Sequence, residues 1–204
     1  MKLIEKNDIA NGEGVRVSLF LSGCRNRCKN CFNPETWNFC YGNPFTKEVE
    51  DDIITSLKPS WINVLTILGG EPFEVENQRD LVNFIKRVRK EVPDNTIWMY
   101  SGYLFDSEIH NPNGNVHCEV SDEILENIDI LVNGKFVEEL ENLSLKFRGS
   151  SNQRIIIVKE SLQEVKVILS PLNEYKEFKP MWRKAFFIKV FLFKYEKKID
   201  FCMI

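Results

Sequence analysis

The sequence predicts an α/β fold with a mainly parallel sheet. Short apolar runs of strand length alternate along the chain with longer segments whose apolar residues recur at helical spacing. Successive strand–helix units need crossover connections, and crossovers of this kind join parallel strands. The composition agrees, because 43% apolar and 28% charged residues are ordinary values for a globular domain.

The first half of the chain supplies two strands and two helices. Residues 15–21 form an apolar run that predicts the first strand, and residues 63–68 predict a second that ends at a Gly-Gly pair. Between them, Thr46 can cap a helix whose apolar residues recur at helical spacing. Residues 76–90 predict a second, amphipathic helix, which Pro93 closes.

The second half continues the alternation. Residues 96–100 predict a third strand, and a short helix is expected from Ser121. Residues 129–132 and 154–158 predict a fourth and a fifth strand. In open α/β sheets, sites form at the carboxyl ends of the strands. Polar and glycine-rich segments that directly follow strands are therefore the first places to look for function.

A loop with three cysteines follows the first strand. Cys24, Cys28 and Cys31 have the spacing C-x3-C-x2-C. Three thiolates in one short loop can hold three corners of an iron–sulfur cube and leave the fourth iron without a protein ligand. Because an open iron can bind and reduce a substrate, the spacing favours redox chemistry over a purely structural role.

A structural zinc site is the alternative interpretation of this loop. Such a site needs four closed ligands, usually in two close pairs. None of the remaining cysteines and histidines forms a second pair; they are Cys40, Cys118, Cys202, His110 and His117. A disulfide framework is disfavoured, because no signal peptide is expected and 204 residues can bury a core without cross-links.

Six segments together resemble one family. Their order and spacing resemble the activating proteins of the anaerobic (class III) ribonucleoside-triphosphate reductases, within the radical S-adenosylmethionine superfamily. The resemblance covers residues 1 to about 158, and the cysteine loop alone would indicate only the superfamily. The six segments are residues 11–20, 31–37, 68–72, 97–103, 128–136 and 147–154.

The resemblance implies an incomplete, open (β/α) barrel of the radical S-adenosylmethionine type. It also implies that residues 1–158 are the activase domain and that residues 159–204 are a C-terminal extension of unknown role. The extension is rich in aromatic residues and lysines. Strands that cover the open barrel edge, an amphipathic surface for a partner or membrane, and a segment without function all remain open.

The resemblance also implies the cofactors. Cys24, Cys28 and Cys31 would hold a [4Fe-4S] cluster, and S-adenosyl-L-methionine would bind beside it. Glu71 would pair with the methionine ammonium through a charge-assisted hydrogen bond. The residues expected to contact this cofactor are Asn30, Phe32, Gly69, Gly70, Glu71, Tyr100, Ser101 and Gly102.

Structural explanations exist for several of these residues. A Gly-Gly-Glu sequence can be a tight turn with an acidic residue at a helix start. Phe32 could equally be a core residue, and Tyr100 taken alone is more typical of the core. The family often has an aspartate near the place of Asn133, so a charge expected at this edge of the sheet is missing here.

The implied activity is the reductive cleavage of S-adenosylmethionine. A reduced flavodoxin-like donor would supply one electron, and the products would be methionine and a 5′-deoxyadenosyl radical. That radical would take a hydrogen atom from a glycine of the large reductase subunit. No acid–base residue is required. An activase for a pyruvate formate-lyase-like enzyme is the alternative, but residues 33–37 and the short chain favour the reductase.

Charge and hydropathy exclude other partners. The formal net charge of −3 gives no basic footprint for nucleic acid. No apolar run reaches the roughly 18 residues that a membrane span needs. Six cysteines without a targeting segment suit the reducing cytoplasm, where we expect the protein to act.

Overall fold

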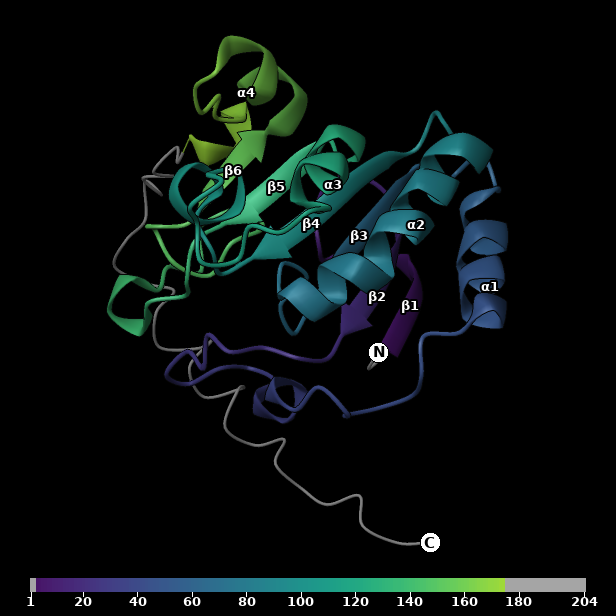
Figure 1. Ribbon diagram of the computed structural model, residues 1–204, viewed down its shortest axis with the longest axis horizontal. Helices are drawn as coiled ribbons and strands as arrows, with labels where there is room; N and C mark the ends of the chain where they lie inside the picture. The colour runs from purple at the N-terminus through teal and green to yellow at the C-terminus, as the bar shows by residue number, and fades with distance from the viewer. Residues whose placement is uncertain (1–2, 175–204) are drawn as a thin grey trace, which may run out of the picture. The chain divides into compact units, whose positions relative to one another are not determined.

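A six-stranded sheet lies at the centre of the computed structural model, which describes residues 3–174 (Figure 1). The strands follow one another across the sheet in chain order. The four inner strands are parallel, as predicted, and each is rich in buried apolar residues. They are β2 (Arg16–Leu21), β3 (Val64–Gly69), β4 (Thr96–Ser101) and β5 (Ile130–Asn133).

The two edge strands run antiparallel to their neighbours. β1 (Leu3–Asp8) pairs with β2, and β6 (Arg154–Ile157) pairs with β5. The sequence predicted β6 as a strand but not β1, because most side chains of β1 are exposed and its apolar pattern is weak. The α/β class and the mainly parallel sheet are confirmed, and the open sheet agrees with a partial barrel.

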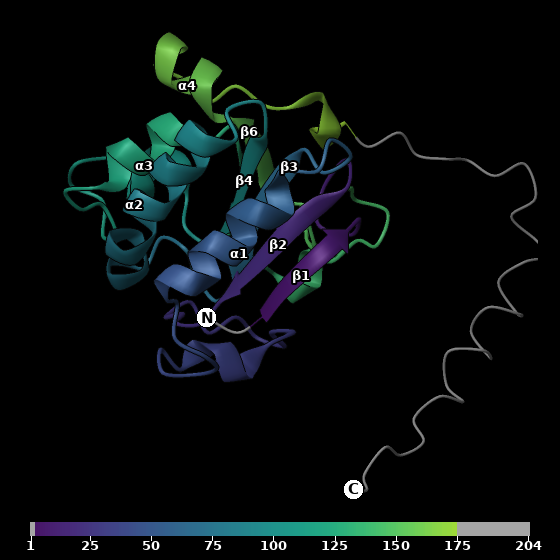
Figure 2. The same cartoon turned by 90° about the vertical axis from the view of Figure 1, so that its right-hand side faces the viewer.

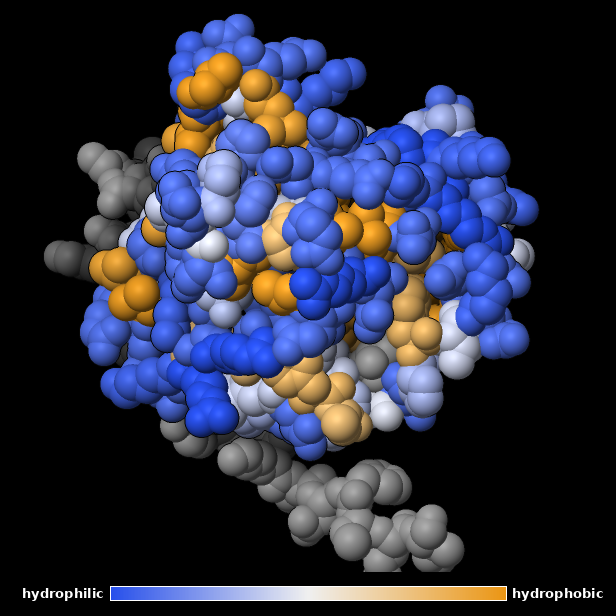
Figure 3. Space-filling view, in the orientation of Figure 1, coloured by the Kyte–Doolittle hydropathy of each residue, from blue (hydrophilic) through white to orange (hydrophobic). Residues whose placement is uncertain are grey.

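Helices α1 (Lys47–Leu57), α2 (Val75–Glu91) and α3 (Ser121–Asn127) lie together on one face of the sheet (Figures 1 and 2). Their apolar residues pack on the strands and form the main core, while the outer surface of the helices is largely hydrophilic (Figure 3). Thr46 is the N-cap residue of α1, although its side chain makes no capping hydrogen bond.

The opposite face of the sheet has a smaller apolar cluster around Trp98 and Val132. Arg16 lies there fully buried, with its guanidinium carbon 5.0 Å from the centre of the Trp98 ring. The same guanidinium donates 2.6 Å to the carbonyl oxygen of Asn11. Through these backbone and ring contacts, Arg16 fixes the loop between β1 and β2 against the sheet.

The compact unit that contains the sheet continues to Asn173. Helix α4 (Val158–Glu164) follows β6 without a break and packs against α3. The side-chain oxygen of Asn173 accepts hydrogen bonds from the Ile155 amide (3.0 Å) and from Arg148 (2.9 Å). The predicted boundary after residue 158 therefore falls within the first turn of α4, inside this compact unit. Residues 175–204 of the predicted extension lie outside the described part. Within residues 3–174, no helix is long and apolar enough to cross a membrane.

Candidate active site

The three cysteines of the loop after β2 line one cavity of about 180 Å³. The cavity lies at the carboxyl ends of β3 and β4, beside the cysteine loop, which occupies the lower edge of the molecule in Figure 1. Cys24 is buried, whereas Cys28 and Cys31 are half-buried. Six of the residues expected at the cofactor also line it: Gly69, Gly70, Glu71, Tyr100, Ser101 and Gly102.

Two of the expected cofactor residues do not line this cavity. The Asn30 amide donates to the carboxylate of Glu138, so it faces the segment after β5. Phe32 is 99% exposed, and the alternative that it is a core residue is therefore wrong. Tyr100 was expected either at the cofactor or in the core. It meets both expectations, because it lines the cavity and also packs against the apolar cluster around Trp98.

Sequence reasoning assigned no role to six further residues that line the cavity. Most of them lie in segments 31–37, 128–136 and 147–154, where only the family resemblance drew attention to the chain. Their residue types carry no signal of their own, since aromatic and amide side chains are common in loops. They are Asn26, Thr36, Trp37, Gly134, Phe136 and Gln153.

Gly69 and Gly70 allow two loops to meet at the cavity. Gly69 has a φ of +108°, in the left-handed region that favours glycine. A Cβ on Gly70 would lie 2.6 Å from the carbonyl oxygen of Gly23, the residue before Cys24. The Gly70 amide also donates 3.0 Å to the carbonyl of Leu21, the last residue of β2. Because Gly69 and Gly70 have no side chain, the cysteine loop can contact the end of β3.

Glu71 joins the two sides of the cavity. Its side chain is 1% exposed, and each carboxylate oxygen accepts two hydrogen bonds. One oxygen accepts from the Phe73 amide (3.0 Å) and the Ser101 hydroxyl (2.8 Å). The other accepts from the Gly102 amide (2.7 Å) and from Asn26 of the cysteine loop (2.8 Å). The carboxylate thus connects the loops after β2, β3 and β4.

Comparison with known proteins identifies the family. The 4Fe-4S single cluster domain family matches residues 10–156. The anaerobic ribonucleoside-triphosphate reductase-activating protein of Pasteurella multocida (strain Pm70) is 40% identical over 150 residues, which are 72% of this chain and 90% of that protein. This chain belongs to the family of reductase-activating proteins.

Other members of this family are similar to comparable extents. The activating protein of Escherichia coli (strain K12) is 39% identical over 148 residues, which are 72% of this chain and 90% of that protein. The protein of the same name from Enterobacteria phage T4 is 34% identical over 148 residues, covering 72% of this chain and 87% of that protein. No solved structure matches the chain.

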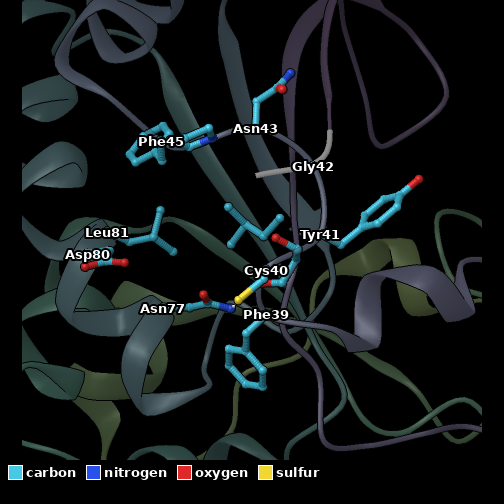
Figure 4. A pocket seen from close by; sticks show the side chains of 12 residues that line it. Phe39, Cys40, Tyr41, Gly42, Asn43, Phe45, Asn77, Asp80 and Leu81 are labelled. Carbon is cyan, nitrogen blue, oxygen red and sulfur yellow. Dashed lines mark hydrogen bonds between the residues drawn. The ribbon is translucent and has the colours of Figure 1, made fainter.

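A zinc module is therefore the wrong interpretation of the cysteine loop. The described candidates for a fourth ligand all lie elsewhere. Cys40 lines a second cavity of about 270 Å³ between the segment after the cysteine loop and α2, together with Asn77 and Asp80 (Figure 4). His110 and His117 are loop residues, and their ring nitrogens contact Asp122 (3.0 Å) and the Ile109 carbonyl (2.8 Å).

Three thiols in one cavity are the donor set expected for a cluster with one open iron. Cys24, Cys28 and Cys31 face one cavity, yet no three Cys, His, Asp or Glu side chains among residues 3–174 converge on a point that one metal ion could occupy. A [4Fe-4S] cube takes one thiolate on each of three separate irons, so it would use all three thiols of this cavity. Burial raises the pKa of the Cys24 thiol to about 11, so the thiol must lose its proton when iron binds.

Asn133 stands where the family resemblance led us to expect an aspartate. The side chain is fully buried at the end of β5, and its oxygen accepts 3.3 Å from Nε of Arg154 on β6. Arg154 instead forms an ion pair with Asp106, with 2.8 Å between Nη2 and Oδ1. The positive charge of Arg154 is therefore balanced from the loop after β4.

We expect Glu71 to make the stability of the metal-free protein depend on pH. Burial raises the pKa of Glu71 to about 7, and it outweighs the hydrogen bonds that lower it. The folded protein therefore holds this proton more tightly than the unfolded chain does. The resulting stabilisation is full below the ordinary pKa of a glutamate and is lost as the pH rises through about 7.

Urea unfolding at about pH 5.5 and about pH 8 measures this effect. The free energy of unfolding should fall by about 2 kcal/mol more in the native protein than in Glu71→Gln, which has no titrating proton there. An equal fall in both proteins would contradict a raised pKa at Glu71.

Proposed function

We propose that this chain activates an anaerobic ribonucleoside-triphosphate reductase by generating a glycyl radical on its large subunit. Cys24, Cys28 and Cys31 would bind a [4Fe-4S] cluster, and S-adenosyl-L-methionine would bind in the same cavity. A reduced flavodoxin-like protein of the cytoplasm would donate the electron. The single observation that carries the proposal is that one cavity gathers three thiols, the Gly69–Gly70 pair and the strand ends of β3 and β4.

The bound cluster and S-adenosylmethionine supply the one-electron chemistry that cleaves the bond between sulfur and C5′. The chain itself binds and orients. Gly69 and Gly70 let the backbone approach the cofactor, and Ser101 and Gly102 end β4 on the other side. Glu71 holds these two sides at a fixed separation, because its carboxylate accepts from both loops. All of its hydrogen bonds are made within the protein, so it would act on the cofactor by positioning these loops.

Phe32 and Asn30 lie outside the cavity, beside Cys31, and have other roles in the proposal. The exposed Phe32 follows Cys31 directly, so its ring is free to pack against the adenine or against the reductase beside it. Asn30 is held by Glu138, which fixes the backbone next to Cys31.

Electron paramagnetic resonance tests the proposal. The protein is reconstituted with iron and sulfide without oxygen and is reduced with dithionite. A [4Fe-4S]⁺ signal that changes shape on addition of S-adenosylmethionine is the expected result. The loaded protein is then mixed with an anaerobic reductase or with a pyruvate formate-lyase-like enzyme. A glycyl radical on the reductase alone supports the proposal, whereas an unchanged iron signal or a radical only on the lyase overturns it.

A further inference from the structure

Glu74 is a second buried carboxylate in the turn between β3 and α2. Its residue is 2% exposed and it does not line the cysteine cavity. It occupies the N-cap position of α2, where a shorter Asp, Asn, Ser or Thr side chain usually accepts a hydrogen bond from the first turn of the helix. The Glu74 side chain makes no such capping bond. Its carboxylate is directed elsewhere.

The partners of Glu74 are the cysteine loop and the loop after β4. One carboxylate oxygen accepts from the Arg25 amide (2.6 Å) and from the Tyr103 hydroxyl (3.1 Å). The other accepts from the Arg25 guanidinium at 2.6 Å. Arg25 follows Cys24 directly, and Tyr103 follows Gly102, which lines the cavity. One side chain therefore connects the first cysteine to the far wall of the site.

We propose that Glu74 is a positioning residue that fixes Cys24 before the cluster binds; its benefit to activation rests on the function proposed above. Glu71 and Glu74 make two parallel bridges between the same pair of loops. Glu71 joins Asn26 to Gly102. Glu74 joins Arg25, which precedes Asn26, to Tyr103, which follows Gly102. A loop held at one point can pivot, whereas a loop held at two neighbouring points cannot.

The cost of burying a carboxylate supports a positioning role. Buried charges contribute little net stability, because desolvation offsets most of their attraction, and apolar residues of the same size often stabilise a fold equally well. What a carboxylate adds is direction, since each hydrogen bond to it has a preferred geometry. At Glu74 two of the three bonds go to one residue, and one of these goes to a backbone amide.

Glu76 provides a matched control. Its carboxylate pairs with the same guanidinium, at 2.6 Å, but its side chain is 52% exposed. It accepts from the guanidinium of Arg25 and has no hydrogen bond to the Arg25 amide or to Tyr103. Replacing Glu76 removes one negative charge beside Arg25 without removing the bridge between the loops.

The test measures how fast iodoacetamide alkylates Cys24 in the metal-free protein, by mass spectrometry of its peptides. Cys118, which lies beside Gln78 of α2, serves as the internal reference. In Glu74→Ala the Arg25 amide loses its acceptor, and we expect Cys24 to react about tenfold faster relative to Cys118. In Glu76→Ala the ratio should change less than about twofold, as for an exposed ion pair.

A purely structural role gives a different result, because general destabilisation exposes Cys24 and Cys118 together. Equal acceleration of both thiols, or an unchanged Cys24, would overturn the proposal. Tyr103→Phe keeps the packing and removes one hydroxyl, so it tests the bridge even if Glu74→Ala does not fold; we expect an increase of about threefold. An unchanged ratio in Tyr103→Phe would also overturn it.

The loaded protein adds a spectroscopic measurement. We expect Glu74→Ala to broaden the [4Fe-4S]⁺ signal, because Cys24 is held less uniformly, while Glu76→Ala retains the native shape. If the native protein assembles no cluster, the proposed function fails, yet the ratio of the two alkylation rates still decides the role of Glu74. The two proposals can therefore fail separately.

Discussion

Replacing Cys28 by alanine is expected to abolish both the [4Fe-4S] cluster and the cleavage of S-adenosylmethionine. Two thiols remain in the cavity of the variant, and none of the other described cysteines lines it. A cube held at two corners loses iron readily, because thiolates are the only protein ligands that the loop offers. Iron and sulfide content after reconstitution, the [4Fe-4S]⁺ signal and the yield of 5′-deoxyadenosine measure the effect.

Cys40→Ala is the matched control for this experiment. Cys40 is exposed and lines the second cavity, not the cysteine cavity (Figure 4). We expect this variant to keep the native iron content and the native yield of 5′-deoxyadenosine. A Cys28→Ala protein that still cleaves S-adenosylmethionine, or a Cys40→Ala protein that loses its cluster, would show that the ligands are assigned wrongly.

Replacing Gly70 by alanine is expected to have the second largest effect. The new Cβ would lie 2.6 Å from the Gly23 carbonyl oxygen and 3.0 Å from the Ser22 carbonyl carbon. Both contacts are with backbone, so no side-chain rotation relieves them. Gly70 does not have a positive φ, and the strain therefore arises only from the cysteine loop. Overpacking of this kind costs about 1–3 kcal/mol, and here the loop itself must move.

Two measurements separate the local effect from a general one. The free energy of unfolding of the metal-free variant should fall by about 1–3 kcal/mol. Cluster content and cleavage should fall more than this loss of stability explains, because the displaced residues, Ser22 and Gly23, directly precede Cys24. A Gly70→Ala protein with native iron content and native cleavage would mean that the two loops do not meet as closely as described.

The sequence alone was sufficient for the inner part of the fold. β2, β3, β4 and β5 are apolar runs, and the amphipathic helix over residues 76–90 became α2 with one further residue at each end. Patterns of this kind report burial on one face, which is the main determinant of these elements. The exposed strand β1 was missed for the same reason. The antiparallel direction of β6 depends on how the chain returns to the sheet, which no local pattern records.

The sequence also indicated the chemistry of the site, because the C-x3-C-x2-C spacing places three thiols in one short loop that can bind an iron–sulfur cluster. It placed Gly70, Glu71 and Ser101 at the ends of strands, and these residues do line the cysteine cavity. It gave no reason to notice Asn26 or Glu74, whose residue types are ordinary in loops. Their importance lies in partners that are distant along the chain, such as Tyr103.

Tertiary structure alone decided what the carboxylates contact. In the sequence, Glu71 is either a charged group available to a ligand or an acidic residue at a helix start, and Glu74 has no assigned role. In the fold both are buried, and each carboxylate is occupied by donors from the cysteine loop and from the loop after β4. Residue type fixes which atoms can donate or accept, whereas only the packing of β2, β3 and β4 side by side brings those atoms within hydrogen-bond distance.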